Sequence, residues 1–502
     1  MMRHLLLPVC LLACCLPASA ADEAPPRCTY MQISTLPVRL VGPWLEPAVE
    51  GTIDGTPATM LVDTGNYKMH ITMTGAIRRG MKLHKTKRSV EGFAGLSDLF
   101  EVNLQDISIG SSRNSGNTVV DVIQSTTSAP VYDAVVGAPF LLQADLEVDL
   151  PAKRLRLFQP RNCDTEPLYL WDEATGMVPF VAGDEYESPN PHFTVTINGK
   201  PVDAVIDTGV PFSILKLRAA RRIGIDVDGP DVKRAGSMGG VGTESVRVWK
   251  ARVKSFAIGG ETISDAELGI NDSRISSSSE LLLGRDFLRT HRVLFAMSQK
   301  KLYFAYLGGQ PFSPKPSLEP WMLEEAENGN PDAQYALAAR YRSGTGVARD
   351  EVLGRVWLDK AAANGEPHAN IDSGTQLVKT GKYPEAIEKL RKGLDRLPTD
   401  RYGALWLYLA RMHNGEAALA QTELRAGLQK LGNDIWPGPI AKFYLGDFSA
   451  SRLLDSAGAN KDLARTRTCE ARRFMARWQA AQGDAKREEP LLPKADADCD
   501  QS

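Results

Sequence analysis

The tripeptide Asp-Thr-Gly occurs twice in this 502-residue chain, beginning at Asp63 and at Asp207. Each copy follows a short apolar run, as expected where a buried strand delivers a polar side chain. Two carboxylates held about 3 Å apart cannot both ionise, so such a pair shares one proton and can act as base and acid together. That chemistry can activate a water molecule and protonate a leaving amide nitrogen without a metal or a covalent intermediate.

The sequence around the two tripeptides is duplicated. A single Asp-Thr-Gly is weak evidence, because Asp and Gly are common turn residues. Here Asp54-Gly55 and Asn198-Gly199 precede the two copies at one offset, 144 residues (198 − 54 and 207 − 63). Farther along, apolar-apolar-Gly segments end at Gly137 and Gly284, at an offset of 147 residues (284 − 137). A loop insertion produces such a drift, so we interpret the two halves as one fold written twice.

Each half is predicted to be a β lobe. Asp-Gly and Asn-Gly are hairpin-turn dipeptides, because both central residues of such turns tolerate positive φ. The segments that flank Asn198-Gly199, from Phe193 to Ile197 and from Val202 to Ile206, are rich in β-branched residues. One short helix per half is expected after Phe140 and after Phe287. We therefore expect a bilobal, all-β domain in which each lobe presents one aspartate.

Residues 45–305 resemble a tandem, single-chain version of the retropepsin-type aspartic peptidases, which are related more distantly to pepsin. The resemblance rests on the strand–Asp-Thr-Gly–strand segments, on glycine-rich stretches at the flap positions, and on the supporting apolar-Gly segments at Gly137 and Gly284. It implies that Asp63 and Asp207 are catalytic and that one chain supplies both lobes, so a monomer suffices. It also implies that the catalytic loops are braced by Thr64, Gly65, Thr208 and Gly209.

The glycine-rich stretches match the flaps of these families, which close over a bound peptide. The resemblance implies substrate contacts at Gly92, Phe93, Gly95, Gly240, Val241 and Gly242. The alternative is a pair of flexible hairpins without substrate contact. One departure from the family pattern follows each Asp-Thr-Gly, where Ala, Ser or Thr is usual but this chain has Asn66 and Val210. This difference predicts an asymmetry between the two lobes.

No other catalytic system is evident in the sequence. The histidines lack metal-ligand spacing, and a His-Glu-x-x-His motif, a Gly-x-Ser-x-Gly elbow and a phosphate loop are all absent. We therefore expect no metal and no cofactor. The net charge of −2 and the pI of about 6.4 do not favour a nucleic-acid partner. A basic run that begins at Arg78-Arg79 is interpreted as a solvated face.

The N-terminus has the features of a signal peptide over residues 1–20. The alternative is a lipid anchor at Cys14, in a stretch that resembles a bacterial lipobox. No later segment is apolar enough for a transmembrane helix, so a periplasmic or secreted protein, or a membrane-tethered lipoprotein, is expected. Four cysteines remain after residue 20, which allows three disulfide pairings. We favour Cys28–Cys163 and Cys469–Cys499, because each pair brackets a separate domain.

The chain is predicted to change from β to helical after a linker. We expect lobes at 29–160 and 161–306, a Pro/Gly-rich linker at 307–320, helical repeats at 321–483 and a tail at 484–502. Residues 326–365 resemble a Sel1-type repeat and residues 381–394 a tetratricopeptide unit. Further helices are predicted near 402–412 and 417–431. Stacked helix pairs offer a concave face to a peptide or protein partner; the alternative is an array that only caps the lobes.

These observations favour an exported aspartic endopeptidase whose substrate is a peptide or protein bound as an extended strand. A helical-repeat array would bind the substrate or a protein partner. The alternative is a non-catalytic or partner-activated peptide-binding adaptor that uses the same cleft.

Overall fold

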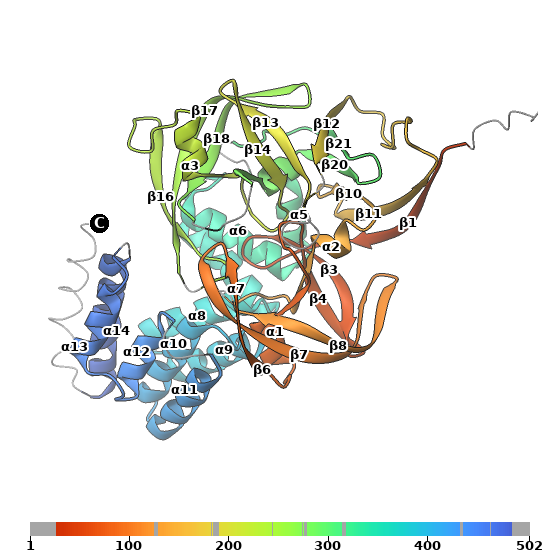
Figure 1. The fold of residues 1–502 in the computed structure, drawn as a ribbon. Coiled ribbons are helices and arrows are strands. Elements are labelled where there is room, and N and C mark those ends of the chain that lie inside the picture. The colour runs from red at the N-terminus through yellow and green to blue at the C-terminus, as the bar shows by residue number, and fades with distance from the viewer. Residues whose placement is uncertain are drawn as a thin grey trace, which may run out of the picture.

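The computed structural model describes residues 27–124, 129–181, 183, 190–242, 244–273, 275, 279–313, 318–431, 435–461 and 463–483. The predicted signal peptide with Cys14, and the predicted tail with Cys499, lie outside these residues. The described chain forms a β-rich region that extends to Tyr306 and a helical region from Pro320 to Ala481 (Figure 1). The predicted fold class, a bilobal β domain followed by helices, is confirmed.

The first lobe is an eight-stranded sheet in the order β2-β3-β4-β9-β5-β8-β7-β6, in which β3 also pairs with β7. Its strands are β2 (Arg39–Val41), β3 (Glu46–Ile53), β4 (Thr56–Asp63), β5 (His70–Thr72), β6 (His84–Gly92), β7 (Gly95–Ile109), β8 (Ser112–Ile123) and β9 (Ala134–Gly137). The predicted Asp54-Gly55 turn joins β3 to β4 with φ of 48° and 73°. The extra β3–β7 pairing wraps the sheet around an apolar core.

The second lobe repeats this arrangement. It comprises β13 (His192–Ile197), β14 (Lys200–Ile206), β15 (Ile214–Lys216), β16 (Val232–Met238), β17 (Val246–Ile258), β18 (Glu261–Asn271) and β19 (Leu281–Leu283). The Asn198-Gly199 turn joins β13 to β14, with φ of 51° and 76°. In both lobes the strand leading to the aspartate lies parallel to the strand of the apolar-Gly segment, β4 beside β9 and β14 beside β19. The duplication inferred from the sequence therefore exists in space.

The described residues of each lobe form two short helices where one was predicted. The helices α2 (Ala138–Leu141) and α4 (Arg285–Leu288) contain Phe140 and Phe287, so the expectation that a helix follows these residues was wrong in position. Each begins directly after the glycine of the apolar-Gly segment. The other two, α1 (Met73–Arg78) and α3 (Leu217–Arg222), were not predicted.

A shared sheet joins the lobes. The strands β1 (Thr29–Pro37), β11 (Arg154–Arg161), β10 (Asp145–Asp149), β20 (His291–Ala296), β21 (Lys301–Tyr306) and β12 (Thr175–Val181) are adjacent in that order. The pairing of β10 with β20 crosses between the halves of the chain. The predicted Cys28–Cys163 disulfide is formed and connects the start of this sheet to the residues after β11.

The helical region consists of α5 (Pro320–Glu327), α6 (Pro331–Ser343), α7 (Glu351–Ala363), α8 (Pro367–Lys379), α9 (Tyr383–Arg396), α10 (Arg401–His413), α11 (Ala417–Leu431), α12 (Gly438–Tyr444), α13 (Ala450–Gly458) and α14 (Ala464–Ala481). We call these helices the array. Several begin with side-chain caps, such as Asn330, Asp350 and Asp400, that accept hydrogen bonds from the first turn. The predicted helices near 402–412 and 417–431 correspond to α10 and α11. None of the described helices is long and apolar enough to cross a bilayer.

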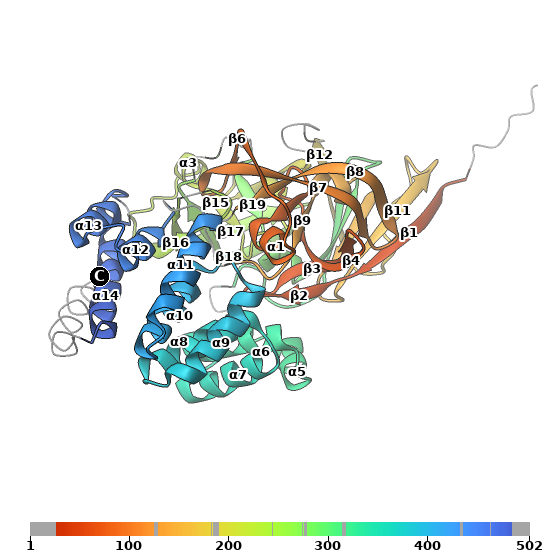
Figure 2. The same cartoon turned by 90° about the horizontal axis from the view of Figure 1, so that it is seen from below.

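The array packs directly on the lobes (Figure 2). Met322 and Ala336 belong to the same apolar cluster as the lobe cores, and Ala129 belongs to the cluster inside the array. In the predicted linker, Phe312 is 2% exposed and its ring lies 4.8 Å from that of Phe256. The array is therefore joined to the lobes through continuous apolar contacts.

Hydrogen bonds reinforce this contact. The hydroxyl groups of Thr74 and Thr399 are 2.5 Å apart, and Arg78 donates to the Arg396 carbonyl at 2.8 Å. The interpretation of Arg78 and Arg79 as a solvated face was wrong, because both guanidinium groups are mostly buried and pair with Asp133. The partner lies more than 50 residues away along the chain, so the local charge pattern did not reveal it.

Candidate active site

The two Asp-Thr-Gly turns meet where the lobes face each other. Asp63 is the last residue of β4, and Asp207 directly follows β14. Because the two strands occupy equivalent places in their lobes, they deliver the two aspartates from opposite sides. The Asp207 residue is 7% exposed, whereas Asp63 is half-buried.

Thr64 and Thr208 bind each other's turns. The Thr208 hydroxyl accepts from the Thr64 N–H at 3.0 Å and donates to the Val62 carbonyl at 2.7 Å. The Thr64 hydroxyl accepts from the Thr208 N–H at 3.1 Å and donates to the Ile206 carbonyl at 2.7 Å. Both threonines are fully buried, so each hydrogen bond is made in a low-dielectric setting where an unpaired group would be costly.

The glycines of the two turns allow a close approach of the aspartates. A Cβ at Gly65 would lie 2.2 Å from the Asp207 Oδ2, and a Cβ at Gly209 would lie 2.6 Å from the Asp63 Cγ. No side chain fits at either position without separating the turns. Each glycine N–H also donates to the aspartate of its own turn, at 2.9 Å for Gly65 and 2.8 Å for Gly209. The positions predicted as loop-bracing are therefore all in contact across the interface.

The two carboxyl groups are hydrogen-bonded to each other, as the chemistry of a shared proton requires. Burial raises the pKa of Asp63, and the hydrogen bonds from Asp207, Asn66 and Gly65 oppose this rise. Burial raises the pKa of Asp207 well above its ordinary value, and the neighbouring charge of Asp63 adds to the effect. The pair as a whole therefore holds one proton more firmly than an isolated carboxyl group would, and the larger rise in pKa is that of Asp207.

The predicted asymmetry between the lobes has a structural counterpart. The Asn66 side chain hydrogen-bonds to the Asp63 carboxylate and lowers its pKa. Val210 occupies the equivalent position after Gly209, and its side chain has no polar atom to offer Asp207. The difference in residue type therefore stabilises charge on Asp63 rather than on Asp207.

A buried arginine lies beside the pair. Arg285 is 1% exposed and donates to the carbonyls of Thr208 and Gly209 at 3.1 and 2.9 Å. Its positive charge lowers the pKa of both aspartates, and burial lowers the pKa of Arg285 itself to about 10. Sequence analysis missed this residue, although its position directly after Gly284, at the start of a helix, was a usable signal.

A cleft of about 1460 Å³ contains the aspartate pair. This exceeds the roughly 300–1,000 Å³ of typical small-molecule sites. The predicted residues that line it are Asp63, Gly65, Asp207, Gly209, Gly92, Phe93, Gly240 and Val241. The array and the connections between its helices also contribute, through Trp321, Met322, Ala336, Ala339, Arg340, Ser343, Thr345, Thr399 and Arg401.

The two flap tips touch. The β6–β7 hairpin of lobe 1 and the β16–β17 hairpin of lobe 2 meet where the Ala94 N–H donates to the Val241 carbonyl at 2.8 Å. The Glu244 N–H donates back to the Ala94 carbonyl at 2.9 Å. A Cβ at Gly242 would lie 2.2 Å from the Ala94 backbone. We call this contact the flap joint.

The predicted flap residues divide into two groups. Gly92, Phe93, Gly240 and Val241 line the cleft, whereas Gly95 and Gly242 are not among the residues that line it. Gly95 and Gly242 have φ of 90° and 130°, and they shape the hairpin tips. Ser273, which was not predicted, donates to the Phe93 carbonyl at 2.8 Å and so holds the first flap against the second lobe.

The supporting glycines pack against the turns. A Cβ at Gly137 would lie 2.7 Å from the Asn66 carbonyl oxygen, and one at Gly284 would lie 2.7 Å from the Phe212 backbone. Both positions therefore require glycine because the backbone after each Asp-Thr-Gly turn passes close to them.

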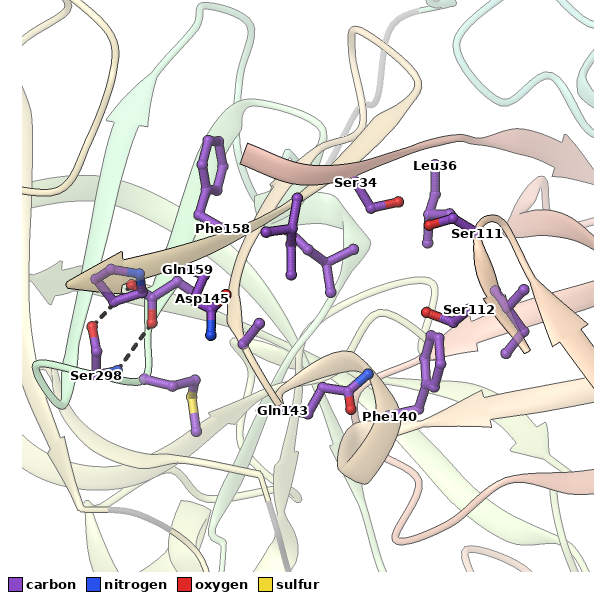
Figure 3. Close-up of a pocket in the computed structure, with 16 residues that line it drawn as sticks. Ser34, Leu36, Ser111, Ser112, Phe140, Gln143, Asp145, Phe158, Gln159 and Ser298 are labelled. Carbon is purple, nitrogen blue, oxygen red and sulfur yellow. Dashed lines mark hydrogen bonds between the residues drawn. The ribbon is translucent and has the colours of Figure 1, made fainter. Parts of the chain in front are cut away.

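Figure 3 shows a smaller cavity, which has a volume of about 520 Å³ and is not lined by Asp63 or Asp207. Ser34, Phe140, Gln143 and Asp145 are among the residues around it. Asp145 accepts hydrogen bonds from the N–H and hydroxyl groups of Ser298, each at 3.0 Å. None of the predicted catalytic, bracing or flap residues lines this cavity.

Both lobes match models of aspartyl protease families. Residues 49–142 match the family described as "gag-polyprotein putative aspartyl protease", and residues 193–287 match the family described as "Aspartyl protease". Each match contains one Asp-Thr-Gly turn and one apolar-Gly segment. The lobes are thus similar to two aspartyl protease domains in tandem, which supports peptidase function in general.

Proposed function

We propose that this protein is an exported aspartic endopeptidase in which a single chain provides the whole active site. The observation that carries the proposal is the hydrogen-bonded pair of Asp63 and Asp207, held by reciprocal Thr64 and Thr208 contacts inside a large cleft. Its lining comes from both lobes, both flaps and the array. A peptide or protein is the substrate class that such a cleft accommodates, as an extended strand beneath the flaps.

The mechanism follows from the unequal environments of the two carboxyl groups. Asp63, ionised and supported by Asn66, removes a proton from a water molecule while the water oxygen attacks the carbonyl carbon. Asp207, which retains its proton, donates it to the carbonyl oxygen. The tetrahedral intermediate then collapses: one of its hydroxyl groups gives its proton to Asp207 as the carbonyl re-forms, the C–N bond breaks, and the amide nitrogen takes the proton that Asp63 had removed from the water molecule. A carboxylate and a carboxylic acid are restored at the end of the cycle.

Export and partner binding are further parts of the proposal. The Cys28–Cys163 disulfide fits an oxidising compartment such as the periplasm or the extracellular space. The array supports substrate or partner binding because its residues extend the lining of the cleft beyond the lobes. Its assignment to Sel1-type or tetratricopeptide repeats is part of the proposal.

Substitution of the aspartates tests the proposed activity. Asp63→Asn and Asp207→Asn should each reduce peptide cleavage by at least about 10³-fold, because a single carboxyl cannot serve as both acid and base. Binding of an uncleavable peptide should persist. Asp350→Asn is the matched control, because Asn caps the start of α7 as well as Asp does. If wild-type protein cleaves no unfolded protein substrate between acidic and neutral pH, the proposed activity is wrong and a binding function is favoured.

A peptidase that is activated by a partner is the second candidate, and the flap joint favours it. The joint closes the flap tips together over the cleft. Arg467 of α14 is near enough to Glu244, beside the joint, to interact with it electrostatically. If the array holds the flaps closed, Arg467→Ala should raise kcat/KM for a protein substrate. An unchanged kcat/KM would remove the support for this candidate.

A further inference from the structure

We infer that Asp332, a residue of the array, is a positioning residue for the aspartate turn of the second lobe. It acts through the turn at residues 42–45 and through Arg285. The inference rests on the proposed aspartic peptidase function and extends it. It makes the array part of the machinery that holds the active site in shape, in addition to any role in binding.

The first link joins the array to the first lobe. Asp332 is in the first turn of α6 and is 9% exposed. Its Oδ1 accepts a hydrogen bond from the Gly42 N–H at 2.7 Å. Gly42 has a φ of 69°, which favours glycine, and its carbonyl accepts from the Leu45 N–H at 3.1 Å to close the turn between β2 and β3. A carboxyl that accepts from a buried backbone N–H is costly to remove.

The second link joins this turn to Arg285. The Trp44 carbonyl accepts from the Arg285 Nη2 at 3.3 Å. The Trp44 residue is 60% exposed, so its ring does not anchor the turn. The buried Leu45 anchors one end of the turn, and the hydrogen bond from Gly42 to Asp332 fixes the other. The position of the Trp44 carbonyl therefore depends on the array.

The third link joins Arg285 to the aspartate pair. The other terminal nitrogen of Arg285 donates to the Thr208 and Gly209 carbonyls, which belong to two consecutive peptide bonds of the Asp207 turn. A buried guanidinium group needs acceptors in fixed positions, because its charge is expensive to bury without them. If the Trp44 carbonyl moves, Arg285 loses the hydrogen bond to that carbonyl and shifts within the site. The Asp207 turn then loses its support, and both aspartates lose part of a stabilising positive charge.

Each link is a direct contact, and residue 332 is 290 positions from residue 42 in the chain. The coupling therefore passes from Asp332 to the turn at residues 42–45, from that turn to Arg285, and from Arg285 to the Asp207 turn. Neither Asp332 nor Gly42 lines the cleft, whereas Pro43, Trp44 and Leu45 of the turn do. Asp332 therefore makes no substrate contact of its own, and a loss of substrate contacts through the turn would raise KM, whereas loss of support for the Asp207 turn would lower kcat.

The test compares three substitutions of Asp332 in the full-length protein. Asp332→Ala removes the acceptor and should lower kcat by roughly 10- to 100-fold, as expected for a small misplacement of catalytic groups, while KM changes less than about twofold. The charged and titratable groups that act on Arg285 are Glu46, Arg289, Asp207 and Tyr132. The variant should also move the acidic limb of the pH–rate profile to higher pH, because a displaced Arg285 no longer favours the ionised pair as strongly. Asp332→Asn keeps an oxygen in place and should retain most of kcat. Asp332→Glu keeps the charge but displaces the oxygen, so it should lower kcat more than Asp332→Asn does.

A matched control separates positioning from general loosening of the array. Glu325 pairs with Lys153 between β10 and β11, which also joins the array to the β-rich region. The other carboxylate oxygen of Glu325 accepts from Asn330, the cap of α6, and a Gln side chain can keep that hydrogen bond. Glu325→Gln should therefore leave kcat and the acidic limb unchanged. If Asp332→Ala does not fold, the comparison of Asp332→Asn with Asp332→Glu decides the question on its own.

The possible failures are distinguishable. An inactive wild-type protein contradicts the proposed peptidase function. An active wild-type protein together with an Asp332→Ala variant of normal kcat and pH profile contradicts the positioning role alone. Equal losses of kcat in Asp332→Ala and Glu325→Gln would likewise contradict the positioning role, because the cause would then be a general loosening of the array. An inactive Asp332→Asn beside an active Asp332→Glu would show that charge matters rather than the hydrogen bond, and would overturn the inference.

Discussion

Thr64 and Thr208 are connected reciprocally, since the hydroxyl group of each accepts from the backbone N–H of the other at 3.0 and 3.1 Å. Each hydroxyl also donates across the interface to a backbone carbonyl of the opposite strand, at 2.7 Å. The turns of two lobes are thereby locked at the point where the aspartates meet. Neither lobe can move relative to the other without breaking buried hydrogen bonds.

Removal of one of these hydroxyl groups should weaken both turns. Thr64→Ala or Thr208→Ala leaves a buried N–H and a buried carbonyl without partners, and we expect a loss of about 1–3 kcal/mol in the free energy of unfolding. The double variant should lose less than the sum of the two, because the bonds form one unit. Urea unfolding of the single, double and Thr→Ser variants measures this. Additive losses, or equal losses from Thr→Ser, would contradict the reciprocal arrangement.

The glycines of the turns allow a sharper test of the carboxyl–carboxyl contact. Gly65→Ala places a methyl group about where the Asp207 Oδ2 lies, at a separation of 2.2 Å. The carboxyl groups must then separate, so we expect kcat to fall by roughly 10²-fold or more. Gly427→Ala in α11 is the matched control, because a Cβ there has nothing within 4 Å, and its kcat should be that of the wild type. A Gly65→Ala enzyme with normal kcat would show that the close approach is not needed.

Much of this site could be predicted because its signals are local. The Asp-Thr-Gly turns, the apolar strands before them and the Asp54-Gly55 and Asn198-Gly199 hairpins are encoded within a few residues of each other. The duplication also predicted one long-range relationship, namely that the second Asp-Thr-Gly occupies the equivalent position in a second lobe. Asn66 and Val210 were recognised as different for the same reason.

The remainder depends on contacts between distant segments, which periodicity and turn chemistry do not report. Asp332 is typical of the first turn of a helix and gives no local sign that it binds Gly42. The Arg78-Arg79 pair has the appearance of a surface charge run until Asp133 is brought beside it. The pairing of β10 with β20 likewise could not be predicted, because the two strands come from different halves of the chain and neither half alone indicates the pairing.

The Cys28–Cys163 disulfide should contribute stability without affecting the chemistry. It closes a segment with a sequence separation of 135 residues, and loss of such a bridge typically costs about 2–5 kcal/mol. Cys28→Ser/Cys163→Ser should therefore unfold at lower urea concentration, while kcat/KM measured well below the transition stays within about twofold of wild type. A large fall in kcat/KM would mean that the shared sheet controls the aspartate pair.

The raised pKa of Asp207 predicts a stability that decreases with pH. Below the unfolded pKa of about 3.9 the carboxyl is protonated in both states and has no effect. As the pH rises above this value, the unfolded chain releases the proton and the folded protein retains it, so the free energy of unfolding falls until the folded pKa is reached. Asp207→Asn removes this dependence. The variant should equal wild type near pH 3 and be more stable at pH 7; urea unfolding at the two pH values measures the difference.

The asymmetry between Asn66 and Val210 should be visible in the pH dependence of catalysis. Asn66→Val removes the hydrogen bond that favours the ionised form of Asp63, so the pKa of the pair for its first proton loss should rise. The acidic limb of kcat/KM should then move to higher pH by roughly one pH unit, the size expected for one hydrogen bond to a charged group. Val210→Asn should act on the other member: it favours ionised Asp207 and should move the basic limb to lower pH. Limbs that stay in place in both variants would mean that these side chains do not decide which aspartate carries the charge.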